Sequence, residues 1–103
     1  LNLSLIFSDN GATIALAEYV SGSEENHVKK MNQKAKELGM EKTKFYNVTG
    51  LTSYDYGDLI LPDVKPMDYN VSSARDLSVL AISLTKKYPE VLEITAKPSY
   101  TFR

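Results

Sequence analysis

Apolar and polar positions divide the chain into helical segments separated by short polar breaks. Residues 1–7 are mostly apolar, and their pattern predicts the end of a helix. After a polar break, a second apolar segment predicts a helix over residues 11–20 that ends at Gly22. Ser8 or Asp9 can cap this helix, because both residue types are favoured at the N-cap position.

The next segment has a one-sided apolar stripe, which predicts a third helix that begins at Ser23 and stops before Gly39. The stripe consists of Val28, Met31, Ala35 and Leu38. Residues 43–48 contain strand-forming aromatic residues and predict a short strand. Residues 52–70 read as an irregular loop, and we expect Asn47 to hydrogen-bond within its own loop.

A longer helix is predicted to begin at Ser73, with Asp76 as the second member of a capping box. Its apolar face is broad enough to predict that the helix is buried on more than one side. The apolar residues of this face are Leu77, Val79, Leu80, Ala81, Ile82 and Leu84. A short helix follows Pro89, and residues 99–102 alternate like a strand. The fold class predicted is mainly α with one or two short β-strands.

Composition restricts the possible functions. The chain has 103 residues, a formal net charge of −1 and no cysteine, which suits one small domain without disulfides, thiol catalysis or cysteine-ligated zinc. No basic field predicts nucleic-acid binding, and no apolar run reaches the roughly 20 residues that span a bilayer. The spacing of four acidic residues matches no calcium loop, so we expect no metal and no cofactor. They are Asp55, Asp58, Asp63 and Asp68.

The polar break near the N-terminus contains the candidate chemistry. Ser8-Asp9-Asn10 fits the pattern S-x-N, although a helix cap explains these three residues on their own. As S-D-N, the tripeptide is also one of three short elements of the penicillin-recognising serine enzymes, beside S-x-x-K and K-T-G. In that chemistry the S-x-N serine relays a proton toward the leaving group, and the asparagine holds the substrate amide.

Further blocks along the chain carry a resemblance to a known family. They read A-L-A-E at residues 15–18, M-N-Q-K-A-K-E-L-G-M at 31–40, T-K-F-Y-N-V-T-G-L at 43–51 and S-S-A-R-D at 72–76. In this order they closely resemble the low-molecular-mass penicillin-binding proteins, which are serine-type D-alanyl-D-alanine carboxypeptidases of the peptidase S11 type. The likeness covers nearly the whole chain.

The resemblance implies roles for two residues and a place in a larger fold. Ser8 would be a catalytic proton relay, and Asn10 would be both catalytic and substrate-binding. Residues 1–103 would form a single helical subdomain of the β-lactamase/penicillin-binding-protein (transpeptidase-like) fold, whose sheet lies in flanks outside this chain. Two positions depart from the family: Gly11 stands where Asp is usual, and His27, which we expect to be solvated, stands where an aromatic residue is common.

The other two elements of the active site are not found. Lys42-Thr43-Lys44 lacks the glycine of K-T-G. Ser83-Leu84-Thr85-Lys86 matches S-x-x-K, but it falls in the last turn of a predicted helix, where Lys86 complements the helix dipole. It also follows S-x-N, whereas the family's nucleophile precedes it. We therefore expect the nucleophile upstream of Leu1 and K-T-G downstream of Arg103, and an inactive isolated chain.

The resemblance also implies a substrate and a location. The parent enzyme would remove the terminal D-alanine from peptidoglycan stem pentapeptides through an acyl-enzyme, and would bind β-lactams. It would be exported to the outer face of the cytoplasmic membrane or the cell wall, in a Gram-positive bacterium. The alternative is a non-catalytic helical interaction module or a degenerate relative. Apolar surface on the isolated chain predicts homo-oligomers or domain swapping.

Overall fold

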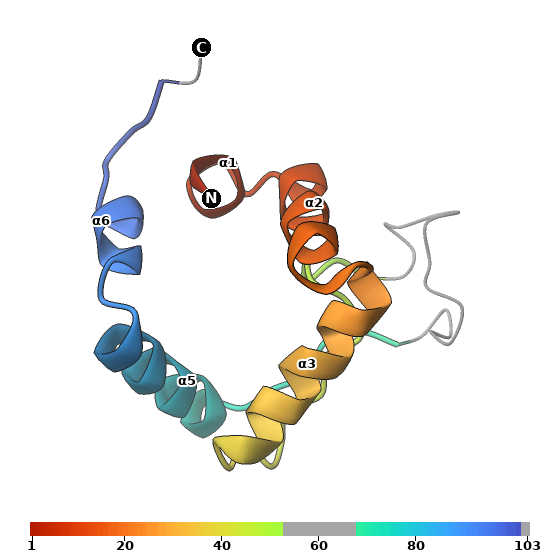
Figure 1. The fold of residues 1–103 in the computed structure, drawn as a ribbon. Coiled ribbons are helices and arrows are strands. Elements are labelled where there is room, and N and C mark those ends of the chain that lie inside the picture. The colour runs from red at the N-terminus through yellow and green to blue at the C-terminus, as the bar shows by residue number, and fades with distance from the viewer. Residues whose placement is uncertain (53–67, 102–103) are drawn as a thin grey trace.

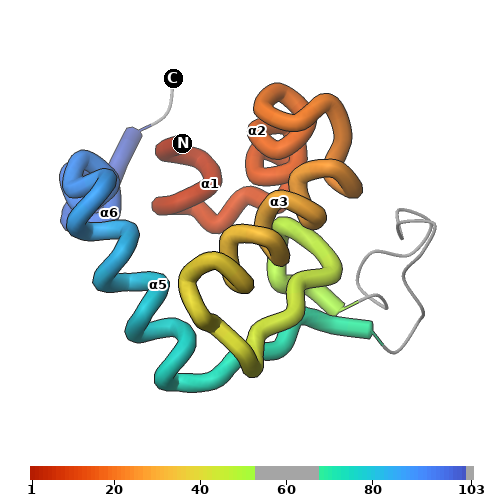
Figure 2. Tube along the Cα trace, turned by 60° about the horizontal axis from the view of Figure 1, so that its bottom comes forward, coloured from red at the N-terminus to blue at the C-terminus, as the bar shows by residue number. Residues whose placement is uncertain are grey.

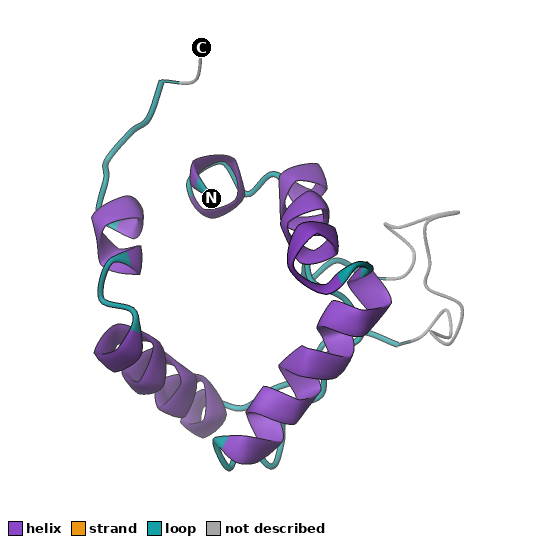
Figure 3. Ribbon diagram, viewed as in Figure 1, coloured by secondary structure: helices purple, strands orange, loops and turns teal. Residues whose placement is uncertain are grey.

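A computed structural model of the chain describes residues 1–52 and 68–101, and most of these residues are helical (Figure 3). The helices are α1 (Asn2–Leu5), α2 (Asn10–Ser21), α3 (Glu24–Glu37), α5 (Ala74–Lys87) and α6 (Val91–Thr95). They follow one another around a ring, which brings α6 back to α1 near the two ends of the chain (Figure 1). The prediction of a mainly helical fold is confirmed.

The helices begin and end where the capping residues predict. At the start of α3, the Ser23 hydroxyl accepts a hydrogen bond from the backbone N–H of Asn26 at 3.1 Å. Gly22 and Gly39 follow α2 and α3 with φ angles of 84° and 75°, a left-handed conformation that glycine adopts without steric cost. Gly22 and Ser23 therefore form the corner between α2 and α3, and Gly39 lies just past the end of α3.

A small set of apolar side chains forms the core. Ala17 of α2, Val28 and Ala35 of α3, and Met40 just after α3 are buried. The main helix contacts of the described residues join α2 to α3, and α1 to both α2 and α6. The predicted stripe of α3 therefore faces the interior, as its spacing requires.

Helix α5 differs from the prediction that it is buried on more than one side. Leu77 and Ile82 are 52% and 57% exposed, and Leu84 is 40% exposed. Val79 and Leu80 are only half-buried. Because the main helix contacts involve α1, α2, α3 and α6, the apolar stripe of α5 is left open in this chain.

The predicted strand at residues 43–48 is reduced to a single antiparallel bridge between Lys44 and Val71. This segment runs back beneath α3, beside the chain that leads into α5 (Figure 2). Its next backbone groups are paired by a side chain: the Asn32 amide donates to the Phe45 carbonyl at 2.8 Å, and its oxygen accepts from the Phe45 N–H at 2.8 Å. Side-chain partners thus replace a neighbouring strand. Residues 99–101 are also without strand structure.

Two further asparagines fix the turn that follows. The Asn47 amide, which is buried, donates to the Leu51 carbonyl at 2.8 Å, and its oxygen accepts from the Gly50 N–H at 2.7 Å. The Asn70 oxygen accepts from the N–H groups of Tyr46 and Asn47 at 2.7 and 3.1 Å. The prediction that Asn47 bonds within its own loop is confirmed. Most of the predicted irregular loop, residues 53–67, lies outside the described residues, as do Asp55, Asp58 and Asp63.

Candidate active site

Ser8, Asp9 and Asn10 form the junction between α1 and α2. Asn10 is the first residue of α2, Asp9 is its N-cap, and Ser8 precedes the cap with a φ of 55°. All three residues are exposed. Within the described ranges, the side chains of Ser8 and Asn10 form no hydrogen bond, so a hydroxyl and a carboxamide are free to bind a ligand at the start of a helix.

Within this tripeptide, Asp9 has the structural role. Its carboxylate accepts the Ala12 N–H at 2.6 Å, and its carbonyl accepts the Thr13 N–H at 3.1 Å. Its own N–H donates to the Leu3 carbonyl at 3.0 Å, which ties the cap to α1. The prediction that this site caps the helix is confirmed for Asp9, and the side chains on either side of it stay available.

A pair of hydroxyls also joins the two helices at this point. The Thr13 hydroxyl donates to the Asp9 carbonyl at 2.9 Å. The Ser4 hydroxyl lies 2.5 Å from that of Thr13, and it donates to it because the Thr13 proton is already used. Both side chains are half-buried. The junction is therefore fixed by bonds on both sides of Asp9.

Ser8 has a backbone conformation that costs a non-glycine residue about 1–2 kcal/mol. Residues held in such conformations cluster at functional sites, where surrounding contacts maintain them. Here those contacts are the bonds that Asp9 makes to α1 and α2. Gly11 leaves room for the cap, because a Cβ at this position would lie 3.3 Å from the Asp9 carboxylate, closer than most such contacts.

A second polar cluster lies at the start of α5, where the prediction for Ser73 is confirmed and the prediction for Asp76 is wrong. Ser73 does cap α5, since its hydroxyl accepts the Asp76 N–H at 3.1 Å. The Asp76 carboxylate, however, is not the second half of a capping box. It accepts the Lys42 N–H at 2.8 Å and the Thr43 hydroxyl at 2.7 Å, and the residue is 1% exposed. A contact between residues more than 30 apart leaves no local signal in the sequence.

These bonds determine the charge state of Asp76. Burial favours the neutral acid and raises the pKa, but the hydrogen bonds from Thr43, Lys42 and Ser73 favour the carboxylate. The positive charge of Arg75 acts in the same direction. The net result is a pKa of the Asp76 carboxyl below its ordinary value of 3.8, so Asp76 is ionised at neutral pH and joins α5 to the segment after α3.

The structure also shows where the other candidate residues from the sequence lie. His27, which was expected to be solvated, is half-buried, and its Nδ1 lies 2.8 Å from the Ser21 hydroxyl. Ser83 and Lys86 lie near the C-terminal end of α5, about as far along it as predicted, with Lys86 in its last turn. Ser8 lies between α1 and α2, whereas His27 lies on α3 and Ser83 and Lys86 lie on α5.

The described ranges also lack two kinds of feature. They contain no group of three or more histidine, aspartate or glutamate side chains that could hold a metal ion. None of the helices formed by residues 1–52 and 68–101 is both long enough and apolar enough to span a bilayer.

Comparison with known proteins places the chain in a family. The sequence profile of peptidase S11, described as D-alanyl-D-alanine carboxypeptidase, matches residues 1–103. The D-alanyl-D-alanine carboxypeptidase DacF of Bacillus subtilis is 43% identical over 90 residues, which are 87% of this chain and 19% of that protein. The D-alanyl-D-alanine endopeptidase of Escherichia coli is 38% identical over 104 residues, which cover 99% of this chain and 28% of that protein.

Solved structures agree with this relationship. A peptidoglycan synthesis regulatory factor (PBP3) from Streptococcus pneumoniae superimposes with a TM-score of 0.93 at 46% identity, over 98% of this chain and 27% of that one. Penicillin-binding protein D2 from Listeria monocytogenes, in its cefotaxime-bound form, gives a TM-score of 0.78 at 34% identity, over 98% and 36%.

The chain thus spans only about a fifth to a third of the proteins that it matches. Its helices correspond to a helical part of the penicillin-binding-protein fold. The family match over the whole chain and the agreement in structure lead to one conclusion: this chain belongs to the peptidase S11 family of D-alanyl-D-alanine carboxypeptidases.

Proposed function

We propose that this chain is a helical subdomain of a serine-type D-alanyl-D-alanine carboxypeptidase, and that it contributes the S-x-N element of the active site. The observation that carries the proposal is the pair of exposed, unengaged side chains of Ser8 and Asn10 on either side of the capping Asp9. Capping alone requires only Asp9. A free hydroxyl and a free carboxamide beside it are what the chemistry of the family needs.

In this proposal Ser8 relays a proton, and Asn10 orients the substrate amide. A serine elsewhere in the parent attacks the carbonyl of the terminal D-alanyl-D-alanine bond and forms an acyl-enzyme. Ser8 passes a proton toward the departing D-alanine nitrogen, and Asn10 holds the amide of the stem peptide through its carboxamide. The S-x-x-K and K-T-G elements would come from the flanks, so the chain alone is inactive.

The same site would react with β-lactams, because a β-lactam presents a strained amide to the same nucleophile. The Listeria monocytogenes relative was solved in cefotaxime-bound and ampicillin-bound forms, which supports this part of the proposal. The substrate, a peptidoglycan stem pentapeptide, lies outside the cytoplasmic membrane. The parent would therefore be exported to the outer face of that membrane or to the cell wall, and the similarity to relatives from Bacillus and Streptococcus fits a Gram-positive source.

The full-length protein that contains this chain tests the proposal. It should release D-alanine from a pentapeptide ending in D-alanyl-D-alanine, and should be labelled covalently by a fluorescent penicillin. Residues 1–103 alone should not be labelled. A full-length protein that neither releases D-alanine nor takes the label would instead be the non-catalytic module or degenerate relative, and labelling of residues 1–103 would place a nucleophile inside them.

We further propose that residues 1–103 self-associate when separated from the rest of the protein. Tyr19 and Val20 are 90% and 61% exposed on α2, and Leu77 and Ile82 are more than half exposed on α5. Apolar surface of this extent on a small chain favours dimers or exchanged helices. Sedimentation should show an average mass that rises with concentration, and a monomer with a sharp thermal transition at high concentration would contradict this.

A further inference from the structure

Positive charge is concentrated in one short part of the chain. Residues 29–44 contain six lysines and only two glutamates, a formal charge of +4, whereas the whole chain carries −1. All six lysines are exposed; they are Lys29, Lys30, Lys34, Lys36, Lys42 and Lys44. Such a separation of charge creates a local positive potential that attracts anions even when the net charge is near zero.

Only some of these lysines are neutralised by a neighbour. Lys29 pairs with Glu25 at 3.3 Å, and Lys34 pairs with Glu37 at 3.1 Å. Within residues 1–52 and 68–101, the ammonium groups of Lys30, Lys36, Lys42 and Lys44 have no carboxylate partner. Lys44 lies over the ring of Tyr46, 5.7 Å from its centre, a contact that holds the cation without cancelling its charge.

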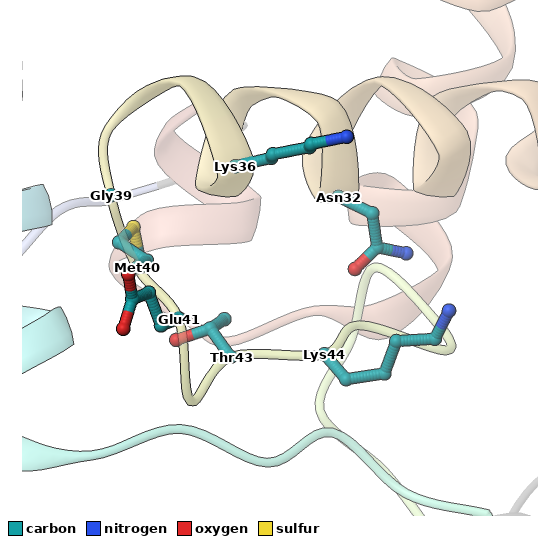
Figure 4. Close-up of a pocket in the computed structure, with 7 residues that line it drawn as sticks. All are labelled: Asn32, Lys36, Gly39, Met40, Glu41, Thr43 and Lys44. Carbon is teal, nitrogen blue, oxygen red and sulfur yellow. The ribbon is translucent and has the colours of Figure 1, made fainter.

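Two of these lysines, Lys36 and Lys44, line the same hollow. A pocket of about 450 Å³ lies between the end of α3 and the segment that follows it. Its lining residues are Asn32, Lys36, Gly39, Met40, Glu41, Thr43 and Lys44. In Figure 4 the nitrogens of Lys36, Asn32 and Lys44 gather toward one end of this pocket, and the Glu41 carboxylate lies at the other end. One end is therefore cationic and bordered by a side-chain amide.

The chemistry of this end suits a phosphate group. Lysine binds phosphate as a compact point charge, and two ammonium groups match a group that carries several anionic oxygens. One proton of the Asn32 amide is used on the Phe45 carbonyl, which leaves the other for a ligand oxygen. We propose that the Lys36–Lys44 pocket binds phosphate groups of a water-soluble, phosphate-bearing polyanion.

A membrane surface fits this region less well. Proteins that lie on a bilayer insert apolar side chains beside their lysines. Of the apolar residues next to or near the lysines in sequence, Val28, Ala35 and Met40 are buried, and Met31 and Phe45 are half-buried. No large apolar side chain of the described residues 21–52 is strongly exposed. The pocket therefore offers charge and concavity without an apolar anchor, which favours a soluble chain of phosphates.

Binding of linear inorganic polyphosphate to the full-length protein tests this inference independently of catalysis. The double variant Lys36→Gln/Lys44→Gln should bind about tenfold more weakly than wild type, since it loses both cations that line the pocket. The matched control Lys29→Gln/Lys34→Gln removes the same total charge from lysines already paired with glutamates, and it should bind within about twofold of wild type. Thermal melting of each variant checks that the fold is kept.

Three outcomes would overturn the inference. One is a wild-type protein that does not bind polyphosphate at moderate ionic strength. Another is an equal loss in the two double variants, because binding would then follow total charge and not this pocket. The third is binding to phosphatidylglycerol vesicles that exceeds binding to polyphosphate and depends on Lys36 and Lys44, which would assign the pocket to a membrane surface.

Discussion

Removal of the Asn32 side chain should loosen the segment that links α3 to α5. In the structure this amide pairs with both backbone groups of Phe45, each at 2.8 Å, in the position that a neighbouring strand would otherwise occupy. The variant Asn32→Ala leaves a partly buried N–H and a partly buried C=O without a protein partner. Each unsatisfied group costs about 1–2 kcal/mol at partial burial, so the expected loss of stability is about 2–4 kcal/mol.

That loss corresponds to about a 30- to 700-fold shift in the opening equilibrium. Amide hydrogen exchange in the full-length protein reports it directly, because the Phe45 N–H loses its acceptor. Its protection factor should fall by at least 30-fold, while that of the interior of α2 is unchanged. Urea denaturation gives the same quantity as a loss of unfolding free energy.

Two control variants separate the amide pair from general effects. Asn32→Asp keeps an acceptor for the Phe45 N–H but no donor for its carbonyl, so its loss should lie between wild type and Asn32→Ala. Gln33→Ala changes an exposed neighbour whose amide makes one long bond to Glu37, and it should lie within about 0.5 kcal/mol of wild type. If Asn32→Ala also stays within 0.5 kcal/mol, the amide does not hold this segment and the reasoning fails.

Three other changes test the junctions that position the site. Asp9→Ala removes the cap of α2 and should lower the free energy of unfolding by about 1 kcal/mol in urea titrations. An unchanged free energy of unfolding would mean that the Asp9 cap does not stabilise α2. Thr13→Val removes the hydroxyl that links Asp9 to Ser4; it should slow acylation by a fluorescent penicillin roughly tenfold, and an unchanged rate would mean that Ser8 does not need this support. The Asp76 carboxyl has a lowered pKa, so its stabilising effect is present above pH 3.8 and is lost as the pH falls through the folded-state pKa. Asp76→Asn should therefore be less stable than wild type at pH 7, and the difference measured by thermal melting should shrink below pH 3.8; a difference that does not depend on pH would contradict an ionised Asp76.

Local signals predicted the helices well. Ser23 and Ser73 begin α3 and α5, and Gly22 and Gly39 follow α2 and α3, because capping and left-handed turns are determined by a few adjacent residues. The tripeptide Ser8-Asp9-Asn10 is also visible in the sequence, since its three residues are contiguous, and its role as an S-x-N element stays a prediction. Its position between the two first helices, with Asp9 as the cap, agrees with the expectation from sequence.

Contacts between distant residues could not be predicted in the same way. Asp76 looked like a capping-box residue, but it bonds to Lys42 and Thr43. The predicted strand at residues 43–48 has strand-forming residues, yet Asn32 takes the place of a partner strand. The stripe of α5 predicted burial that this chain does not supply, because periodicity shows that a face is apolar and not what covers it.

The rate of acylation of the full-length protein by a β-lactam tests the central claim most directly. Ser8→Ala should reduce the second-order rate constant about 100-fold or more, because it removes the proton relay, and Asn10→Ala should reduce it by about tenfold to 100-fold. Ser99→Ala, an exposed serine far along the chain, should leave the rate unchanged. Rates for Ser8→Ala and Asn10→Ala equal to wild type, in folded protein, would show that this tripeptide is only a helix cap.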